Sequence, residues 1–335
     1  VVIAAFAYHP SVVAIAAGDT MSVSNIDAFP HNIVKWYADF LSRKGDRTTD
    51  KGQFAEAETL YLRAVALIKN KFGNETLEVL NTLNNLGALY YDQGNYEKCE
   101  QMFQQVLDIR QKVLPPESYD IAVSLTNLGA ILYREGNYLR AEQIYQQAKT
   151  LWEKLGRKEV FQALNGLAII QLERGDYDQA ETLWKKTLEI IDSAGNQPSQ
   201  SKAVILGNLG GLYFYKGDDE KSERYHLQAL EMRKQTFSPE HPEVAITLNR
   251  LADLYYRKGD IAKAEDYYRQ GLNLLRKTVS DENENVAFAL THLATIEQGK
   301  GNYPKAEAMY QEALQIRTKL FGAKHPQLAE RFGEL

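Results

Sequence analysis

Apolar side chains recur along most of this chain with the spacing of one face of an α-helix. From about residue 27 onward they fall at positions i, i+3, i+4 and i+7, which is the pattern of amphipathic helices. Each such stretch is followed by a short polar turn that contains glycine. The pattern therefore predicts an all-α chain built from antiparallel helix pairs.

The turn glycines indicate that the helix pairs are copies of one unit. Their intervals are 42 residues, except for one interval of 39. The glycines are Gly52, Gly94, Gly136, Gly175, Gly217, Gly259 and Gly301. A fixed period in this range is typical of a repeat array, in which each unit contacts only its neighbours. We therefore expect one right-handed superhelical solenoid.

The first helix of each copy carries two leucines followed by a small residue. In one copy these are Leu83, Leu86 and Gly87, and the position of Gly87 holds only glycine or alanine in all six well-formed copies. Glycine costs about 1 kcal/mol of helix propensity relative to alanine. Its use here predicts that another helix packs closely against this position.

The second helix carries a small residue five positions after the turn glycine and, in six of seven copies, a large ring four positions later. The rings are Tyr61, Phe103, Tyr145, Trp184, Tyr268 and Tyr310, and the exception is His226. Small residues facing large rings predict two interlocking helices. Cys99 holds one of the small positions, so we interpret it as a buried substitute for alanine rather than a reactive thiol.

These positions resemble the tetratricopeptide repeat, which has Leu-Gly and Tyr in its first helix and Ala, an aromatic residue and Ala in its second. The period is longer than the 34 residues typical of that family. The segment from Ser238 to Ala252, with Ala264-Glu265 and Tyr268, resembles the repeat of kinesin light chains and their bacterial relatives. The resemblance covers about residues 27–335. It implies a groove that binds short peptides containing aromatic and acidic residues.

The repeat register divides the chain into four parts. Residues 1–26 form a non-repeat segment, 27–71 a diverged first repeat, 72–322 repeats two to seven, and 323–335 a truncated or capping helix. Aligning Tyr37–Asp46 with Leu251–Asp260 leaves Arg47–Gln53 without a counterpart, which predicts an enlarged turn and an exposed, mobile loop. We also expect a flexible joint at Asp192–Gln200.

Residues 1–26 have an apolar stretch that admits more than one interpretation. Ala14-Ile15-Ala16 has the form of a signal-peptidase site, but no basic residue leads it and His9-Pro10 interrupts the apolar run. We favour a packed end segment, or a sequence foreign to the native chain, over a targeting signal. The run is also shorter than the ~20 residues of a membrane helix, so we expect no membrane partner.

Composition argues against several classes of function. The formal net charge of −5 provides no basic field for nucleic-acid phosphates. One cysteine permits neither an intramolecular disulfide nor a cysteine metal cluster, and no phosphate-binding loop or metal-binding histidine pair is present. We expect no cofactor, no metal, no enzymatic activity and a cytoplasmic location.

One carboxylate recurs at the same position of all seven second helices. The residues are Glu58, Glu100, Glu142, Glu181, Glu223, Glu265 and Glu307. Catalysis needs one asymmetric site, so a residue present in every copy is not a catalytic candidate. We expect these acids to interact with the helix dipole or to bond to an adjacent repeat.

The face of the first helix that lacks the leucines supplies the candidate binding residues. Asn81, Asn85, Ala88 and Asp92 lie on this face, and asparagine recurs at the position of Asn85 in Asn127 and Asn208. An amide can pair with the N–H and C=O of an extended peptide. Alternatively, these amides bond across neighbouring repeats and only shape the groove.

Further candidates adjoin this face. The next position adds Asn84, Asn165 and Asn249, and the C-terminal copies add Arg250, Arg257 and His292 beside Asp253, with Arg134 further back. These cations predict that an acidic peptide segment binds there, with Tyr215 sheltering an aromatic side chain.

The sequence thus predicts a non-enzymatic scaffold or adaptor that binds an extended peptide of a protein partner. The alternative is a regulatory or sensor module of a larger signalling protein, whose ligand is intramolecular. Light chains bind motor heavy chains through a heptad coiled coil, and no sustained heptad occurs here, so a motor partner is unsupported.

Overall fold

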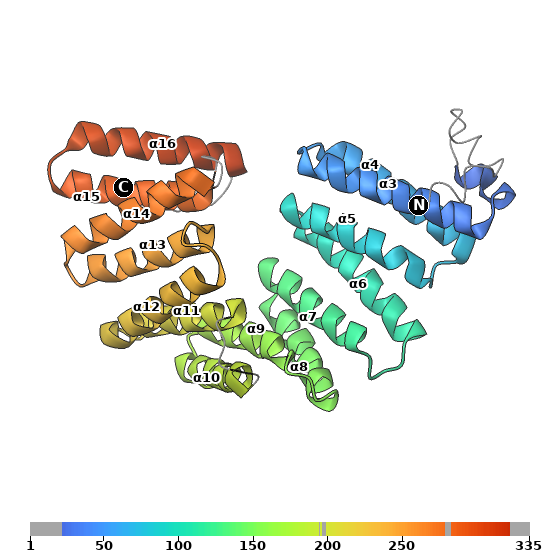
Figure 1. Cartoon of the computed structure of the whole chain (residues 1–335), viewed down its shortest axis with the longest axis horizontal. Helices are drawn as coiled ribbons and strands as arrows, with labels where there is room; N and C mark the ends of the chain where they lie inside the picture. The colour runs from blue at the N-terminus through green and yellow to red at the C-terminus, as the bar shows by residue number, and fades with distance from the viewer. Residues whose placement is uncertain (1–21, 194, 196–198, 279–282, 322–335) are drawn as a thin grey trace. The chain divides into compact units, whose positions relative to one another are not determined.

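The computed structural model describes residues 22–193, 195, 199–278 and 283–321, and all regular structure within them is helical (Figure 1). No strand occurs in these ranges. The elements in chain order are η1 (Val23–Ala28), α3 (His31–Asp50), α4 (Phe54–Phe72), η2 (Leu77–Val79), α5 (Leu80–Asp92), α6 (Tyr96–Val113), α7 (Tyr119–Arg134), α8 (Tyr138–Lys154), α9 (Val160–Glu173), α10 (Tyr177–Ser193), α11 (Gln200–Tyr215), α12 (Asp219–Thr236), α13 (Pro242–Arg257), α14 (Ile261–Thr278), α15 (Glu284–Gly299) and α16 (Tyr303–Phe321).

These helices form consecutive antiparallel pairs, so the predicted all-α fold class is confirmed. Within a pair the two helices are in extensive contact, as in α3 with α4 and α13 with α14, and neighbouring pairs contact each other, as in α4 with α5 and α12 with α13. The chain divides into two compact units between Ile170 and Gln171, which we call unit 1 and unit 2.

Glycine and a side-chain cap form the turns that follow α5 and α7. Gly94 and Gly136 adopt φ of 70° and 86°, a left-handed conformation that favours glycine. The next residues, Asn95 and Asn137, accept hydrogen bonds through their side chains from the backbone N–H groups of Lys98 and Arg140. The turn sequence therefore ends one helix and begins the next.

The predicted loop at Arg47–Gln53 is wrong. Helix α3 continues through Asp50, and Thr48 in its last turn is buried and donates a 2.8 Å hydrogen bond to the carbonyl of Gly45. The turn glycine of this pair is Gly52, whereas Gly45 corresponds to Gly87. The chain therefore has no insertion here, and the mistake arose from aligning Gly45 with a turn glycine.

A ring of the second helix packs directly on the small residue of the first helix, as predicted. A methyl group placed on Gly87 would lie 2.6 Å from the Phe103 ring, and one on Gly129 would lie 2.8 Å from the Tyr145 ring. Gly45 meets Tyr61 and Gly210 meets His226 in the same way. At these four glycines the ring occupies the space that a Cβ atom would take.

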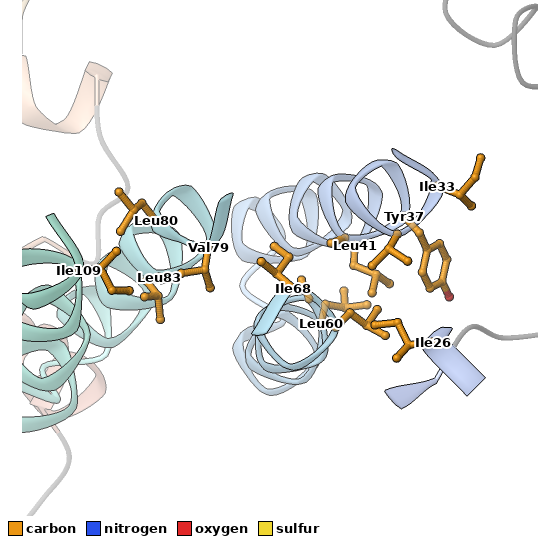
Figure 2. Close-up of a cluster of buried hydrophobic side chains, with 14 of the residues drawn as sticks. Ile26, Ile33, Tyr37, Leu41, Leu60, Ile68, Val79, Leu80, Leu83 and Ile109 are labelled. Carbon is orange, nitrogen blue, oxygen red and sulfur yellow. The ribbon is translucent and has the colours of Figure 1, made fainter. Parts of the chain in front are cut away.

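The core of unit 1 extends to the described end of the N-terminal segment. Figure 2 shows this cluster, in which Ile26 lies near Tyr37 and Leu60. Ile26 is 3% exposed, and Lys71 donates a 3.5 Å hydrogen bond to its carbonyl. Ile26, the last residue of the predicted packed end segment, is therefore packed, whereas residues 1–21 and the side chains of residues 23–25 lie outside what the structure describes.

The repeated glutamates bond to the following repeat, one of the two roles expected for them. Tyr90 donates a 2.7 Å hydrogen bond to Glu58, Tyr213 one of 2.6 Å to Glu181, and Tyr255 one of 2.5 Å to Glu223. In each case a lysine of the later repeat bonds to the same carboxylate. The Tyr90 hydroxyl is the main cause of the lowered pKa of Glu58.

Other expectations lie partly or wholly outside the described residues. These are the capping helix at 323–335 and the joint at 192–200, of which 194 and 196–198 are not described. Cys99 is buried, and burial raises the pKa of its thiol to about 12, so it is not a reactive thiolate at neutral pH. Among the described helices, none has the length and apolar character needed to cross a membrane.

We predict that Gly129→Ala lowers the stability of unit 1 by about 1–3 kcal/mol. The new methyl group overlaps the Tyr145 ring, which cannot withdraw because it also packs on Gly166. Gly211→Ala is the matched control, since no atom lies within 4 Å of its added Cβ. Urea unfolding should show a loss for the first variant and a gain for the second, and equal gains would contradict the packing argument.

We predict that unit 2 loses stability as the pH falls from about 6.5 toward 3. Burial, reinforced by Arg250 and Arg233, lowers the pKa of His226 to about 3 in the folded chain, while the unfolded chain binds the proton near pH 6.5. The loss is about 1.4 kcal/mol per pH unit within this window. His226→Phe should flatten the pH profile of the denaturation midpoint, and an unchanged slope would refute the assignment.

Candidate functional site

A pocket lies on the face of unit 1 that the sequence singled out. It encloses about 430 Å³ between α5 and α7 and reaches Phe103 of α6. Its lining residues are Ala88, Tyr91, Asp92, Phe103, Asn127, Ala130, Ile131 and Arg134. We call this the Asn127 pocket. Five of these residues, Ala88, Asp92, Asn127, Ala130 and Arg134, belong to the predicted face.

The equivalent position one repeat earlier is filled by the chain itself. Asp46, at the register position of Ala88, accepts a 2.7 Å hydrogen bond from the hydroxyl of Tyr61. It also accepts a 2.9 Å hydrogen bond from the side-chain amide of Asn85 in the next repeat. Burial and the bond to Asp46 raise the pKa of Tyr61 to about 12. Asn85 thus bonds across neighbouring repeats.

In unit 2 the equivalent position is also filled by side chains of the chain itself. Tyr268 donates a 2.5 Å hydrogen bond to Asp253, and His292 of the next repeat stacks on the Tyr268 ring with its Nε2 atom 4.0 Å from the Asp253 carboxylate. Burial raises the pKa of Asp253, against the lowering effects of Tyr268 and Arg250. An aspartate, a tyrosine hydroxyl and a polar side chain of the next repeat again meet.

The Asn127 pocket is the same position with two of these groups replaced. Ala88 stands where Asp46 and Asp253 stand, and Phe103 stands where Tyr61 and Tyr268 stand. The carboxylate and the hydroxyl are therefore missing, and the space they would occupy is open. Within the described residues, no hydrogen bond or ion pair involves the side chain of Asn127, Asp92 or Arg134.

The predicted site residues differ widely in exposure. Those exposed are Asn81, Asn127, Arg134, Tyr215, Arg250 and Arg257, and those half-buried are Asn84, Asn85, Asn165, Asn208, Asp253 and His292. The structure brings Asn127 and Arg134 together in one pocket of unit 1 and Arg250, Asp253 and His292 together in unit 2. Peptide binding by any of them stays a prediction.

The prediction that Asn249 lies in the binding groove is wrong, because this residue does not lie on the surface. Its side chain is 3% exposed and packs against α14, where a methyl group on Gly271 would lie 2.5 Å from its Oδ1 atom. Adjacent residues of a helix point about 100° apart, so this position faces its own second helix rather than the groove. Thr126 holds the same register position and accepts a 3.0 Å hydrogen bond from the Trp152 indole.

The two predicted arginines in unit 2 differ in how strongly they are already bonded to the chain. Arg257 donates hydrogen bonds to the carbonyl of Phe214 and to Asp219, and its guanidinium lies 3.7 Å from the centre of the Phe214 ring. Arg250 is more available, with a 60% exposed side chain and a 3.7 Å ion pair to Asp253. Tyr215 is 62% exposed.

Sequence reasoning missed Tyr91, Phe103 and Ile131 as pocket residues. The available signal was Phe103, whose copy is the one with a phenylalanine ring where others have tyrosine, tryptophan or histidine. Its combination with Ala88 removes both partners of a buried hydrogen bond, which leaves an apolar hollow rather than an unsatisfied polar group. Among the described residues, no group of three or more His, Cys, Asp or Glu side chains is placed to hold a metal ion.

Comparison with known proteins identifies the repeat. The family model described as tetratricopeptide repeat matches residues 38–112, 120–193, 201–277 and 285–335. A search among curated proteins finds no match.

Several solved structures are similar to this chain. Aspartyl phosphate phosphatase F from Bacillus subtilis has 12% identity and a TM-score of 0.64, over 84% of this chain and 70% of that one. BtubC (BKLC) from P. vanneervenii has 20% identity and a TM-score of 0.55, over 68% and 91%. A tetratricopeptide repeat protein from Parabacteroides merdae has 18% identity and a TM-score of 0.56, over 88% and 96%. At these identities the likeness concerns the fold alone.

We predict that Asn85→Ala and Asn127→Ala differ in stability by about 1 kcal/mol, the value of one hydrogen bond. Both variants gain the same helix propensity, but Asn85→Ala also removes the bond to Asp46. The measurement is the denaturant midpoint of each variant. Equal midpoints would mean that the Asn85–Asp46 contact contributes nothing.

Proposed function

The chain belongs to the tetratricopeptide repeat family, and from that premise we propose that it is a non-enzymatic scaffold that binds an extended segment of a protein partner. The family's fold generally serves protein interaction. We propose that the segment lies on the first-helix face of unit 1 and inserts one side chain into the Asn127 pocket. We also propose that the protein acts in the cytoplasm.

The observation that supports this proposal is the open Asn127 pocket at Ala88, Phe103 and Asn127. In the filled copies the chain supplies an aspartate at this place, and an Asn or His of the next repeat faces it. A partner can supply the missing group. The pocket volume of about 430 Å³ falls within the ~300–1,000 Å³ of ordinary ligand sites.

The charges suggest which side chain the pocket accepts. Asn127 offers an amide donor where Asn85 donates to Asp46, and Arg134 adds a cation to the rim. An acidic side chain of the partner would therefore find a donor and a positive charge, while Ala88, Ala130 and Phe103 contact its methylene groups. Asp92 on the same rim favours a basic or neutral residue nearby in the partner.

The acidic contact proposed for Arg134 and Asn127 lies in unit 1, whereas the sequence placed it at Arg250, Arg257 and His292 of the C-terminal copies. Arg257 is bonded to the preceding repeat, and Asp253 already faces His292 and Arg250. An acidic segment at this part of unit 2 would meet a carboxylate of the chain itself. The Asn127 pocket also carries a carboxylate, Asp92, but its Arg134 is exposed and takes part in no hydrogen bond or ion pair among the described residues.

We predict that Ala130→Leu weakens peptide binding at least about tenfold, because the larger side chain fills the Asn127 pocket. Short random peptides would first be selected on the native chain by display, and their affinities then measured by fluorescence anisotropy. Ala55→Leu is the matched control, since Ala55 is also exposed but lies on α4 outside the pocket.

The selected peptides also test the acidic contact. Changing their acidic residue to the amide should weaken binding to the native chain and have little effect on Arg134→Gln, which has already lost the cation. Equal binding by the Ala130→Leu and Ala55→Leu variants would contradict the proposed site. Selection of peptides without acidic residues would contradict only the electrostatic part.

A further inference from the structure

A second pocket lies between the second helices α6 and α8. It encloses about 360 Å³ and shares no residue with the Asn127 pocket. Ile121 and Leu125 of α7 form a buried apolar floor, with Leu151 beside them. Exposed polar side chains form its rim, namely Gln111, Gln146, Gln147, Thr150 and Lys154. We call it the glutamine pocket.

Two of the rim residues hold register positions that are bonded to each other in other copies. Gln111 and Gln147 are 36 residues apart, as are Lys69 and Gln105, whose side chains form a 2.9 Å hydrogen bond. Arg276 and Glu312, also 36 apart, form a 2.6 Å ion pair. In those copies a polar pair joins the second helices of neighbouring repeats.

The glutamine pocket lacks this link. Considering only the residues that the structure describes, the side chains of Gln111, Gln146, Gln147 and Lys154 take part in no hydrogen bond or ion pair. Two neutral amides replace the cation and its acceptor, so the attraction that would hold the pair together is weaker. The space between the two helices is therefore accessible above the apolar floor.

The rim chemistry suits the main chain of a polypeptide. Each glutamine amide offers two donors and an acceptor, which is the complement of alternating backbone C=O and N–H groups. The buried surface of Ile121 and Leu125 can receive one apolar side chain of the same segment. No aromatic ring lines the pocket, so a sugar ring has no flat surface on which to stack.

We propose that the glutamine pocket is a second binding site, which holds an extended segment of a protein partner through its main-chain amides and one apolar side chain. Lys154 is the one charged residue among those lining it, and it favours a neutral or acidic segment over a basic one. This site is independent of the Asn127 pocket. A partner that occupies both would bind more tightly than through either site alone.

The test uses the full chain labelled with ¹⁵N-glutamine and the neutral tripeptide acetyl-Ala-Leu-Ala-N-methylamide. Titration should produce saturable shifts of the side-chain amide signals of Gln111 and Gln147, while the signal of Gln105, already bonded to Lys69, stays in place. The double variant Gln111→Arg/Gln147→Glu rebuilds the pair seen at Arg276 and Glu312. It should bind the tripeptide at least about tenfold more weakly, because the pair closes the pocket.

Three results would overturn the proposal. One is the absence of shifts, another is equal binding by the double variant with unchanged helicity, and the third is a response to maltose but not to the tripeptide. The variant Ala130→Leu should leave the shifts unchanged, so failure of this site is distinguishable from failure of the Asn127 pocket.

Discussion

The contact between a second-helix ring and a first-helix glycine or alanine determines most of this structure. It joins the two helices of a repeat at a distance that no larger first-helix residue allows, as between Gly129 and Tyr145. The same contact positions the ring relative to the outer face of the first helix. A tyrosine that stands on the small residue brings its hydroxyl to the next residue of that helix, which is Asp46 for Tyr61 and Asp253 for Tyr268.

The candidate site follows from this packing. Thr295 and Tyr310 repeat the arrangement with a 2.9 Å hydrogen bond between their hydroxyls. Where phenylalanine replaces tyrosine and alanine replaces the polar residue, the structure shows an open pocket. The substitutions are paired, because losing the hydroxyl alone would leave a buried carboxylate with one donor fewer. The pocket thus arises from substitutions within the packing of the repeats and requires no additional helix or loop.

A second set of contacts joins one repeat to the next and involves the recurring glutamate in five of the seven copies. The Glu58, Glu181 and Glu223 carboxylates each accept a hydrogen bond from a tyrosine hydroxyl of the following repeat. In the last copy Glu297 takes the tyrosine position and is bonded to Arg269 and Lys305. Burial of this carboxylate is tolerated because cations surround it, and hydrogen bonds from Lys305 and Asn302 lower its pKa.

The fold could be predicted from the sequence because the repeat period and the pairing of small residues with large rings are both visible within a single repeat. The register of the first repeat could not, since Gly45 and Gly52 both resemble a turn glycine, and the structure distinguishes them by the contact of Gly45 with Tyr61 and by the positive φ of Gly52. The candidate site was predicted as a face but not as a pocket. The asparagines Asn85, Asn127 and Asn249 look alike in sequence, yet one bonds to Asp46, one lines the pocket and one is buried. Their partners lie 22 to 39 residues away, which helical periodicity does not reveal.

The central claim is that Asn127 faces a ligand where Asn85 faces the chain's own aspartate. The most direct measurement is the change in the side-chain amide signals of these two residues, in ¹⁵N-asparagine-labelled full chain, on addition of a selected acidic peptide. The account predicts a saturable shift of the Asn127 signal and none at Asn85. A shift at Asn85, or binding that leaves the Asn127 signal unchanged, would contradict it.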